Sequence, residues 1–107
     1  HLPTPPDIVK PMKVTVELGG GLDALASHKK IHVVELSGQD AIEISELITV
    51  VQSTVIVERH ELFIQDNTIR PGILILINDV DWELCGGKKA SIKDGDVIVF
   101  ISTLHGG

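Results

Sequence analysis

Apolar and polar residues alternate over residues 12–18. Every second position carries an apolar side chain, and polar ones lie between them (Met12, Val14, Val16 and Leu18). This is the period of a strand with one buried face. Glycines at 19–21 break the strand, and a second apolar-rich run covers residues 31–36. Because residues 22–30 separate the two runs, the sequence predicts a hairpin with a long loop or an inserted turn.

A helical period follows the turn cluster at residues 37–40. Apolar side chains then recur on one helical face (Ile44, Leu47, Ile48, Val51 and Val55). Such a face predicts an amphipathic helix over residues 43–57. Asp40 and Glu43 have the spacing of a capping box, one way for the helix to begin. β-Branched residues lower helix propensity here, but the periodicity outweighs that effect.

The second half of the chain favours strands. Residues 61–65 form a short candidate strand, and residues 69–72 have turn chemistry, with Pro71 beside Gly72. Residues 73–77 and 97–101 are continuous apolar runs, which are typical of strands covered on both faces, or nearly so. Asp94 and Gly95 give a strong turn signal before the last run.

The order of these elements predicts an α+β fold. A hairpin, one crossover helix and a buried last strand are the ingredients of the β-grasp arrangement, in which a mixed sheet wraps around one main helix. Right-handed crossover then places the last strand parallel to the first and beside it. We expect a flexible leader over residues 1–11, a β-grasp domain over 12–102 and a flexible tail over 103–107.

Composition and charge restrict the class of protein. A chain of 107 residues fits one domain, and its apolar runs are too short to cross a bilayer. Cys85 is the single cysteine, which excludes an internal disulfide and suits a reducing compartment. The net charge of −6 argues against direct nucleic-acid binding and favours docking onto a basic partner. We therefore expect a monomeric cytoplasmic protein with no membrane association.

Clusters of polar residues give little support for a metal site or an enzyme. Asp79, Asp81 and Glu83 alternate like the start of a calcium loop, but Leu84 and Ala90 occupy the positions that require Gly and Glu. No Ser/His/Asp or Cys/His arrangement is evident. We expect an incidental or packing role for Cys85, a structural role for Trp82, and surface or strand-end positions for four histidines (His1, His28, His32 and His60).

The last residues carry the candidate chemistry. Ser102 is followed by Thr103, Leu104, His105, Gly106 and Gly107. One interpretation is a frayed terminus. The other is a carboxylate on a slender arm, since two glycines without side chains can enter a narrow channel and approach a nucleotide phosphate. From these residues alone the two interpretations are about equally supported.

Three segments of the chain resemble one known family. They are ELGGGLDAL at residues 17–25, RPGILILINDVDWEL at residues 70–84 and VFISTLHGG at residues 99–107. All three are similar to the eukaryotic ubiquitin-related modifiers, the sulfur-carrier relatives of ubiquitin. The resemblance covers nearly everything from Met12 onward.

The resemblance implies a carrier on which other proteins act. An activating enzyme of the ubiquitin-activating type would adenylate the Gly107 carboxylate with ATP, and a persulfide donor would convert it to a thiocarboxylate. The sulfur would serve 2-thiolation of the wobble uridine of tRNA by a tRNA thiolation complex. Alternatively, the activated Gly107 would form isopeptide bonds with lysines of target proteins. The enzyme would recognise the tail through Thr103, Leu104, His105 and Gly106. The chain itself would hold no catalytic residue, bound cofactor or metal.

Two alternatives remain open at this point. A β-grasp sulfur carrier for molybdopterin or thiamine synthesis shares the terminal glycines, but it is not expected to match the segment at residues 70–84. A non-catalytic β-grasp interaction module would have an inert tail.

Overall fold

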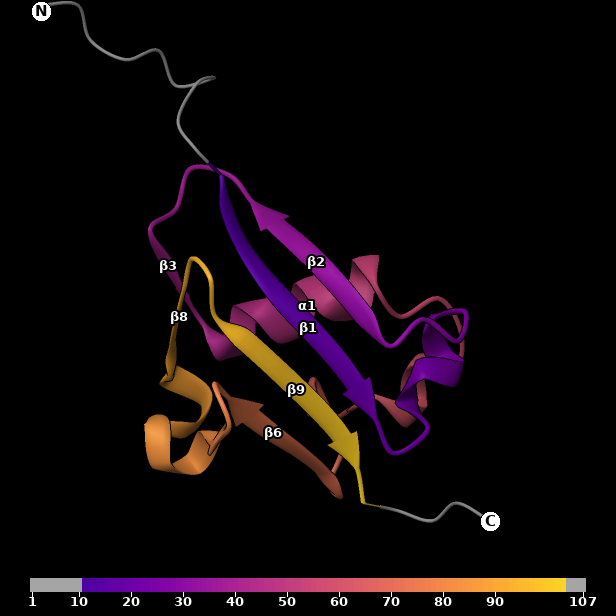
Figure 1. Cartoon of the computed structure of the whole chain (residues 1–107). Coiled ribbons are helices and arrows are strands. Elements are labelled where there is room, and N and C mark those ends of the chain that lie inside the picture. The colour runs from indigo at the N-terminus through magenta and orange to yellow at the C-terminus, as the bar shows by residue number, and fades with distance from the viewer. Residues whose placement is uncertain (1–10, 104–107) are drawn as a thin grey trace, which may run out of the picture.

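The computed structural model of this protein describes residues 11–103 and contains a five-stranded mixed sheet with one α-helix, α1, packed against it (Figure 1). The strands of this sheet lie in the order β2-β1-β9-β6-β7. Their bounds are Met12–Gly19 for β1, Ile31–Leu36 for β2, Ile73–Ile77 for β6, Val80–Asp81 for β7 and Val97–Ser102 for β9.

The first two strands form the predicted hairpin. β1 and β2 pair antiparallel, from Met12 opposite Leu36 to Glu17 opposite Ile31. Their connection contains a short 3-10 helix, η2 (Leu22–Ala26), in place of a tight turn. The alternation of apolar side chains along β1 is realised as alternating buried and more exposed positions. The prediction of an inserted turn is therefore confirmed.

The helix α1 spans Ile44–Thr54 and is shorter than residues 43–57. The predicted capping box is wrong: Glu43 is the N-cap without a side-chain cap, and residues 41–43 form strand β3 (Ala41–Glu43) instead. The Ile44 N–H donates to the Ala90 carbonyl at 2.8 Å, so a backbone group supplies the missing cap. After the helix, the Val51 carbonyl accepts from both Val55 N–H and Ile56 N–H, which interrupts the helical pattern. Val57 N–H then donates to the Leu25 carbonyl at 2.8 Å, so the chain continues toward η2.

The last strand lies at the centre of the sheet. β9 is parallel to β1, with Val16 opposite Ile98, and antiparallel to β6, with Ile75 opposite Phe100. Figure 1 shows β9 between these two neighbours, with α1 behind the sheet. A hairpin, a crossover helix and a central parallel last strand confirm the predicted β-grasp fold.

Several short elements were not predicted from the sequence. β3 pairs with β8 (Ser91–Lys93) in a second small sheet. Within the predicted strand at 61–65, only β4 (Ile64–Gln65) is extended, and it pairs with β5 (Thr68–Ile69). The residues before β4 form the 3-10 helix η3 (His60–Leu62). Two further 3-10 helices follow β7, η4 (Trp82–Cys85) and η5 (Gly87–Lys89).

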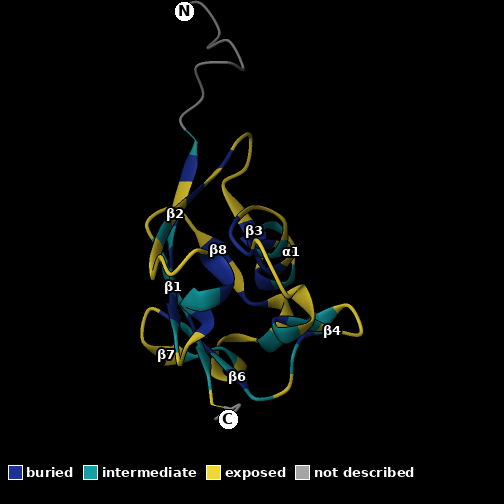
Figure 2. Cartoon of the chain, turned by 90° about the vertical axis from the view of Figure 1, so that its right-hand side faces the viewer, coloured by how far each residue is buried: buried dark blue, intermediate teal, exposed yellow. Residues whose placement is uncertain are grey.

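The hydrophobic core fills the space between the sheet and α1. Phe63 and Phe100 are fully buried and meet edge to face, with ring centroids 5.3 Å apart. Figure 2 shows buried segments toward the middle of the molecule and exposed ones in the loops. No buried side chain among residues 11–103 is polar or charged. Within the same residues, no helix is both long and apolar enough to cross a membrane.

Candidate functional site

The candidate site is the end of β9, where the C-terminal tail begins. Ser102 is the last residue of β9 and lies opposite Ile73 of β6. Thr103, the next residue, donates its backbone N–H to the Gly72 carbonyl at 2.8 Å and its hydroxyl to the same oxygen at 2.5 Å. These bonds fix the position from which the tail leaves the sheet.

Gly20 packs against the other side of the point where the tail leaves the sheet. Gly20 has a φ of +64°, and a Cβ built on it would lie 2.1 Å from the Ser102 carbonyl oxygen. A contact this short means that only a residue without a side chain fits there. The turn after β1 therefore packs directly on the backbone at the end of β9, so that the tail is anchored from both neighbouring segments.

The predicted tail residues divide at this point. Thr103 lies in the described part of the chain, exposed and bonded to Gly72. Leu104, His105, Gly106 and Gly107 lie outside the described residues, so their roles stay predictions.

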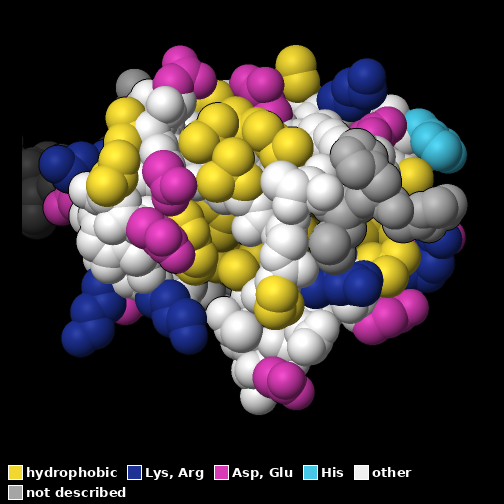
Figure 3. Space-filling view, turned by 90° about the horizontal axis from the view of Figure 1, so that it is seen from below, with side chains coloured by type: hydrophobic (Ala, Val, Ile, Leu, Met, Phe, Trp, Pro, Cys, Tyr) yellow, Lys and Arg dark blue, Asp and Glu magenta, His cyan; other side chains and the backbone are white. Residues whose placement is uncertain are grey.

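An apolar outer sheet face adjoins the tail. Leu74 and Leu76 of β6 lie opposite Ile101 and Val99 of β9, and all four side chains are half-buried. They are on the side of the sheet away from α1, because the alternate residues of both strands are buried in the core. We call these four residues the outer apolar patch. Figure 3 shows hydrophobic side chains gathered at this end of the molecule with acidic ones close by.

The outer apolar patch corrects one sequence expectation. Continuous apolar runs predicted strands covered on both faces, or nearly so. In the described structure the helix covers one face only, and the other face of β6 and β9 is partly open. The continuous apolar runs were the sequence signal for a partner-binding surface. The runs alone do not tell whether a second layer of the same chain or a partner covers the outer face of the strands.

The polar residues considered from the sequence do not form a metal site within residues 11–103, and one of them has a structural role instead. The Asp81 carboxylate accepts a hydrogen bond from Glu83 N–H at 2.9 Å and caps η4. No group of three or more His, Cys, Asp or Glu within residues 11–103 is arranged to hold a metal ion. Trp82 is half-buried against the core, as predicted for a structural residue, whereas Cys85 is exposed and has no packing role.

The histidines are dispersed over the described surface. His28 and His60 are exposed and His32 is half-buried, and none of the three belongs to a metal cluster. The rings of His32 and His60 contact the backbone carbonyls of Lys29 and Ile56. These positions agree with surface and strand-end roles, while His1 and His105 lie outside the described residues.

Comparison with known proteins gives one consistent result. The sequence model of a family described as Urm1 (Ubiquitin related modifier) matches residues 13–107. The chain is 52% identical over 96 residues to a Dictyostelium discoideum protein named ubiquitin-related modifier 1 homolog, covering 90% of this chain and 100% of that protein. A Mus musculus protein named ubiquitin-related modifier 1 is 49% identical over 98 residues, covering 91% and 97%.

A solved structure agrees with the sequence comparisons. The solution structure of Urm1 from Trypanosoma brucei superposes with a TM-score of 0.73 at 34% identity, covering 94% of this chain and 100% of that one. The similarity thus extends over both the sheet and the segment that leads into the tail.

Proposed function

The chain belongs to the ubiquitin-related modifier family, and we propose that its working group is the carboxylate of Gly107, which becomes a thiocarboxylate. Family membership makes the chain a ubiquitin-like sulfur carrier and modifier on which an activating enzyme acts, rather than an enzyme. The observation that carries the proposal is that the family match extends through Gly107 while β9 holds the start of the tail in a fixed position.

The chemistry needs activation because a carboxylate is a poor acyl donor: it is anionic, and it has no good leaving group. One carboxylate oxygen of Gly107 attacks the α-phosphorus of ATP and pyrophosphate leaves, which gives an acyl adenylate. The terminal sulfur of an enzyme persulfide then attacks the acyl carbon and AMP leaves. A second enzyme thiol cleaves the resulting S–S bond, so that an enzyme disulfide forms and the thiocarboxylate is released. No side chain of the carrier takes part as an acid, base or nucleophile.

The fold suits a carrier with a separate point of chemistry. The four residues after Thr103 span at most about 14 Å when extended, at roughly 3.4 Å per residue. The domain therefore stays outside the active site while Gly107 reaches the nucleotide. An enzyme holding the tail must lie against the end of β9, where the outer apolar patch offers a surface for docking.

The sulfur has a proposed destination in tRNA. We propose that the thiocarboxylate supplies 2-thiolation of the wobble uridine through a tRNA thiolation complex in the cytoplasm. In a parallel use, the activated Gly107 acylates lysine amines of target proteins and forms isopeptide bonds. Both destinations follow from the family resemblance and use the same activated terminus.

The direct test is the intact mass of the protein after incubation with its activating enzyme, ATP and a sulfur donor. We expect a gain equal to the replacement of one oxygen by sulfur, localised to Gly107. A variant lacking Gly107 serves as the control and should not gain this mass. An unchanged mass, with an enzyme shown to be active on another carrier, would contradict the proposal and leave an interaction module as the better explanation.

A further inference from the structure

Both arginines of the chain line one hollow beside the start of the tail. Arg59 and Arg70 are the only arginines in the sequence. The hollow has a volume of about 390 Å³, and its wall also includes Gly20, Gly21 and Ser102. Both arginines therefore line the same hollow as Ser102, the last residue of β9, in a protein whose net charge is −6.

The backbone holds the two arginines in place. The Arg59 carbonyl accepts a hydrogen bond from Leu62 N–H at 2.9 Å, at the start of η3. Arg70 N–H donates to the carbonyl of the fully buried Phe63 at 2.9 Å. Both side chains thus extend from backbone positions that hydrogen bonds hold in place, one of them next to the buried Ile69.

Neither guanidinium has an acidic partner within the described residues. The salt bridge found there joins Lys13 to Glu35, on β1 and β2. Arg59 is exposed and Arg70 half-buried, and both residues line the open hollow. A guanidinium presents a planar set of donors that matches a carboxylate or a phosphate.

The position of the hollow distinguishes between these two anions. If Gly107 reaches the nucleotide through an extended tail, the nucleotide phosphates lie up to about 14 Å beyond Thr103. The hollow lies at the near end of the tail, against Ser102. The groups that face it in the activation complex are therefore side chains of the protein that encloses the tail.

We propose that this hollow, which we call the arginine hollow, binds carboxylate side chains of the activating enzyme and orients the tail as it enters the active site. The inference rests on the proposed function. Arg59 and Arg70 act as positioning residues: they contact neither the nucleotide nor the reacting carboxylate. The arginine hollow would add charged contacts to the apolar ones of the outer patch.

The test compares Arg59→Ala/Arg70→Ala with a control that removes the same charge elsewhere, Lys88→Ala/Lys89→Ala, on η5. Two quantities are measured for each: the Kd for the activating enzyme by calorimetry without ATP, and KM and kcat in ATP–pyrophosphate exchange. Loss of paired guanidinium groups should raise Kd and KM at least about tenfold with little change in kcat. The lysine control should change each less than about twofold.

Further variants and outcomes decide between explanations. Arg59→Lys/Arg70→Lys keeps the charge but not the planar donor set, so it should recover part of the affinity. Unchanged Kd and KM in the double alanine variant would overturn the inference. So would a defect confined to the later transfer of sulfur to tRNA, which would indicate phosphate binding.

Failure of the proposed function gives a different result. If the wild-type protein gains no sulfur but binds the enzyme in an arginine-dependent manner, the thiocarboxylate proposal fails and the arginine hollow stands. If activation occurs and the arginines have no effect, the proposal for the arginine hollow fails and the thiocarboxylate proposal stands. If the wild-type protein neither binds nor reacts, both fail.

Discussion

At the scale of single residues, Gly20 is the most constrained position near the tail. Its φ of +64° is unfavourable for residues with a side chain, and its missing Cβ makes room for the Ser102 carbonyl. Gly38 has a similar φ of +72° but nothing within 4 Å of its Cβ position. A comparison of substitutions at these two glycines therefore separates the cost of backbone strain from the cost of steric overlap.

The first prediction uses this pair. Gly20→Ala should lower the free energy of unfolding by about 2 kcal/mol or more, because strain adds to a clash with backbone that has no flexible end to move. Gly38→Ala should cost about 1 kcal/mol from strain alone. Urea denaturation of both variants measures the difference. Equal losses would show that the contact between Gly20 and Ser102 does not constrain the end of β9.

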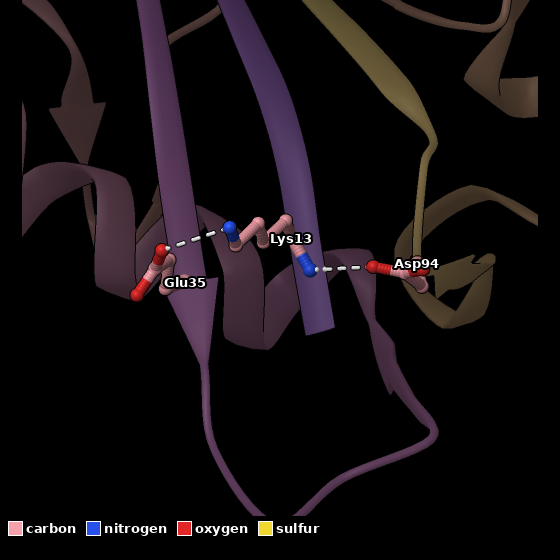
Figure 4. Close-up of polar contacts among 3 residues, drawn as sticks. All are labelled: Lys13, Glu35 and Asp94. Carbon is pink, nitrogen blue, oxygen red and sulfur yellow. Dashed lines mark hydrogen bonds and ion pairs between the residues drawn. The ribbon is translucent and has the colours of Figure 1, made fainter. Parts of the chain in front are cut away.

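A second prediction concerns the turn before β9. The Asp94 carboxylate accepts a hydrogen bond from Lys13 N–H at 2.8 Å, while the Lys13 ammonium pairs with Glu35 at 3.5 Å (Figure 4). Asp94→Ala should cost about 1 kcal/mol in unfolding free energy, since the backbone donor of β1 loses its protein acceptor. Glu35→Ala should cost less than about 0.5 kcal/mol, because that ion pair is exposed. A larger loss for Glu35→Ala would reverse this ranking of the two contacts.

At the scale of elements, the sequence predicts the long periodic segments well and the short ones poorly. The hairpin and α1 repeat an apolar period over enough residues to identify the element, and β6 and β9 are recognisable as continuous apolar runs. β3, β4, β5 and β8 span two or three residues each, so no period develops in them. Their pairing depends on tertiary neighbours, as Glu43 illustrates: it is the first residue of the predicted helix and instead ends β3, which pairs with β8.

The candidate site, too, is predicted from the sequence only in part. The sequence predicts a role for the tail residues because their composition and family resemblance are local features. The fixed start of the tail requires Gly20 to pack on Ser102 and Gly72 to accept hydrogen bonds from Thr103, and these contacts join three separate segments. Both the arginine hollow and the open face of β6 and β9 exist only once the chain is folded.

The third prediction tests the outer apolar patch. Leu76→Asp places a charge between β9 and β7 and should raise KM for the activating enzyme at least about tenfold, if the enzyme docks there. Val33→Asp is the control: it is on the same face of the sheet but on β2, two strands away from β9, and is already 63% exposed. Its KM should change less than about threefold. Far-UV circular dichroism and melting curves verify that both variants fold, and equal effects on KM would exclude a localised patch.

At the scale of the whole molecule, the charge of the domain and the arginine hollow have opposite signs. The chain carries fifteen acidic and nine basic groups, and both arginines lie at the start of the tail. A partner that complements this distribution is basic over most of its contact surface and acidic where the tail enters. Such an arrangement fixes the orientation of the carrier as well as attracting it, because a rotated approach places like charges together.

The fourth prediction follows from this arrangement. KM for the activating enzyme should rise as salt increases from about 50 to 300 mM, because screening weakens both sets of charge contacts, while kcat stays nearly constant. In Arg59→Ala/Arg70→Ala the salt dependence should become weaker, since one of the attractive contacts is gone. The Lys88→Ala/Lys89→Ala variant makes the domain more acidic away from the tail. Its salt dependence of KM should therefore stay the same as in the wild-type protein or become steeper.

The same titration separates steering from local pairing. If only the net charge of −6 matters, the arginine variant becomes more acidic, and its salt dependence should steepen rather than weaken. If the arginine hollow pairs with enzyme carboxylates, the slope falls although the net charge has grown more negative. A KM independent of salt in the wild-type protein would contradict both and assign docking to the outer apolar patch alone.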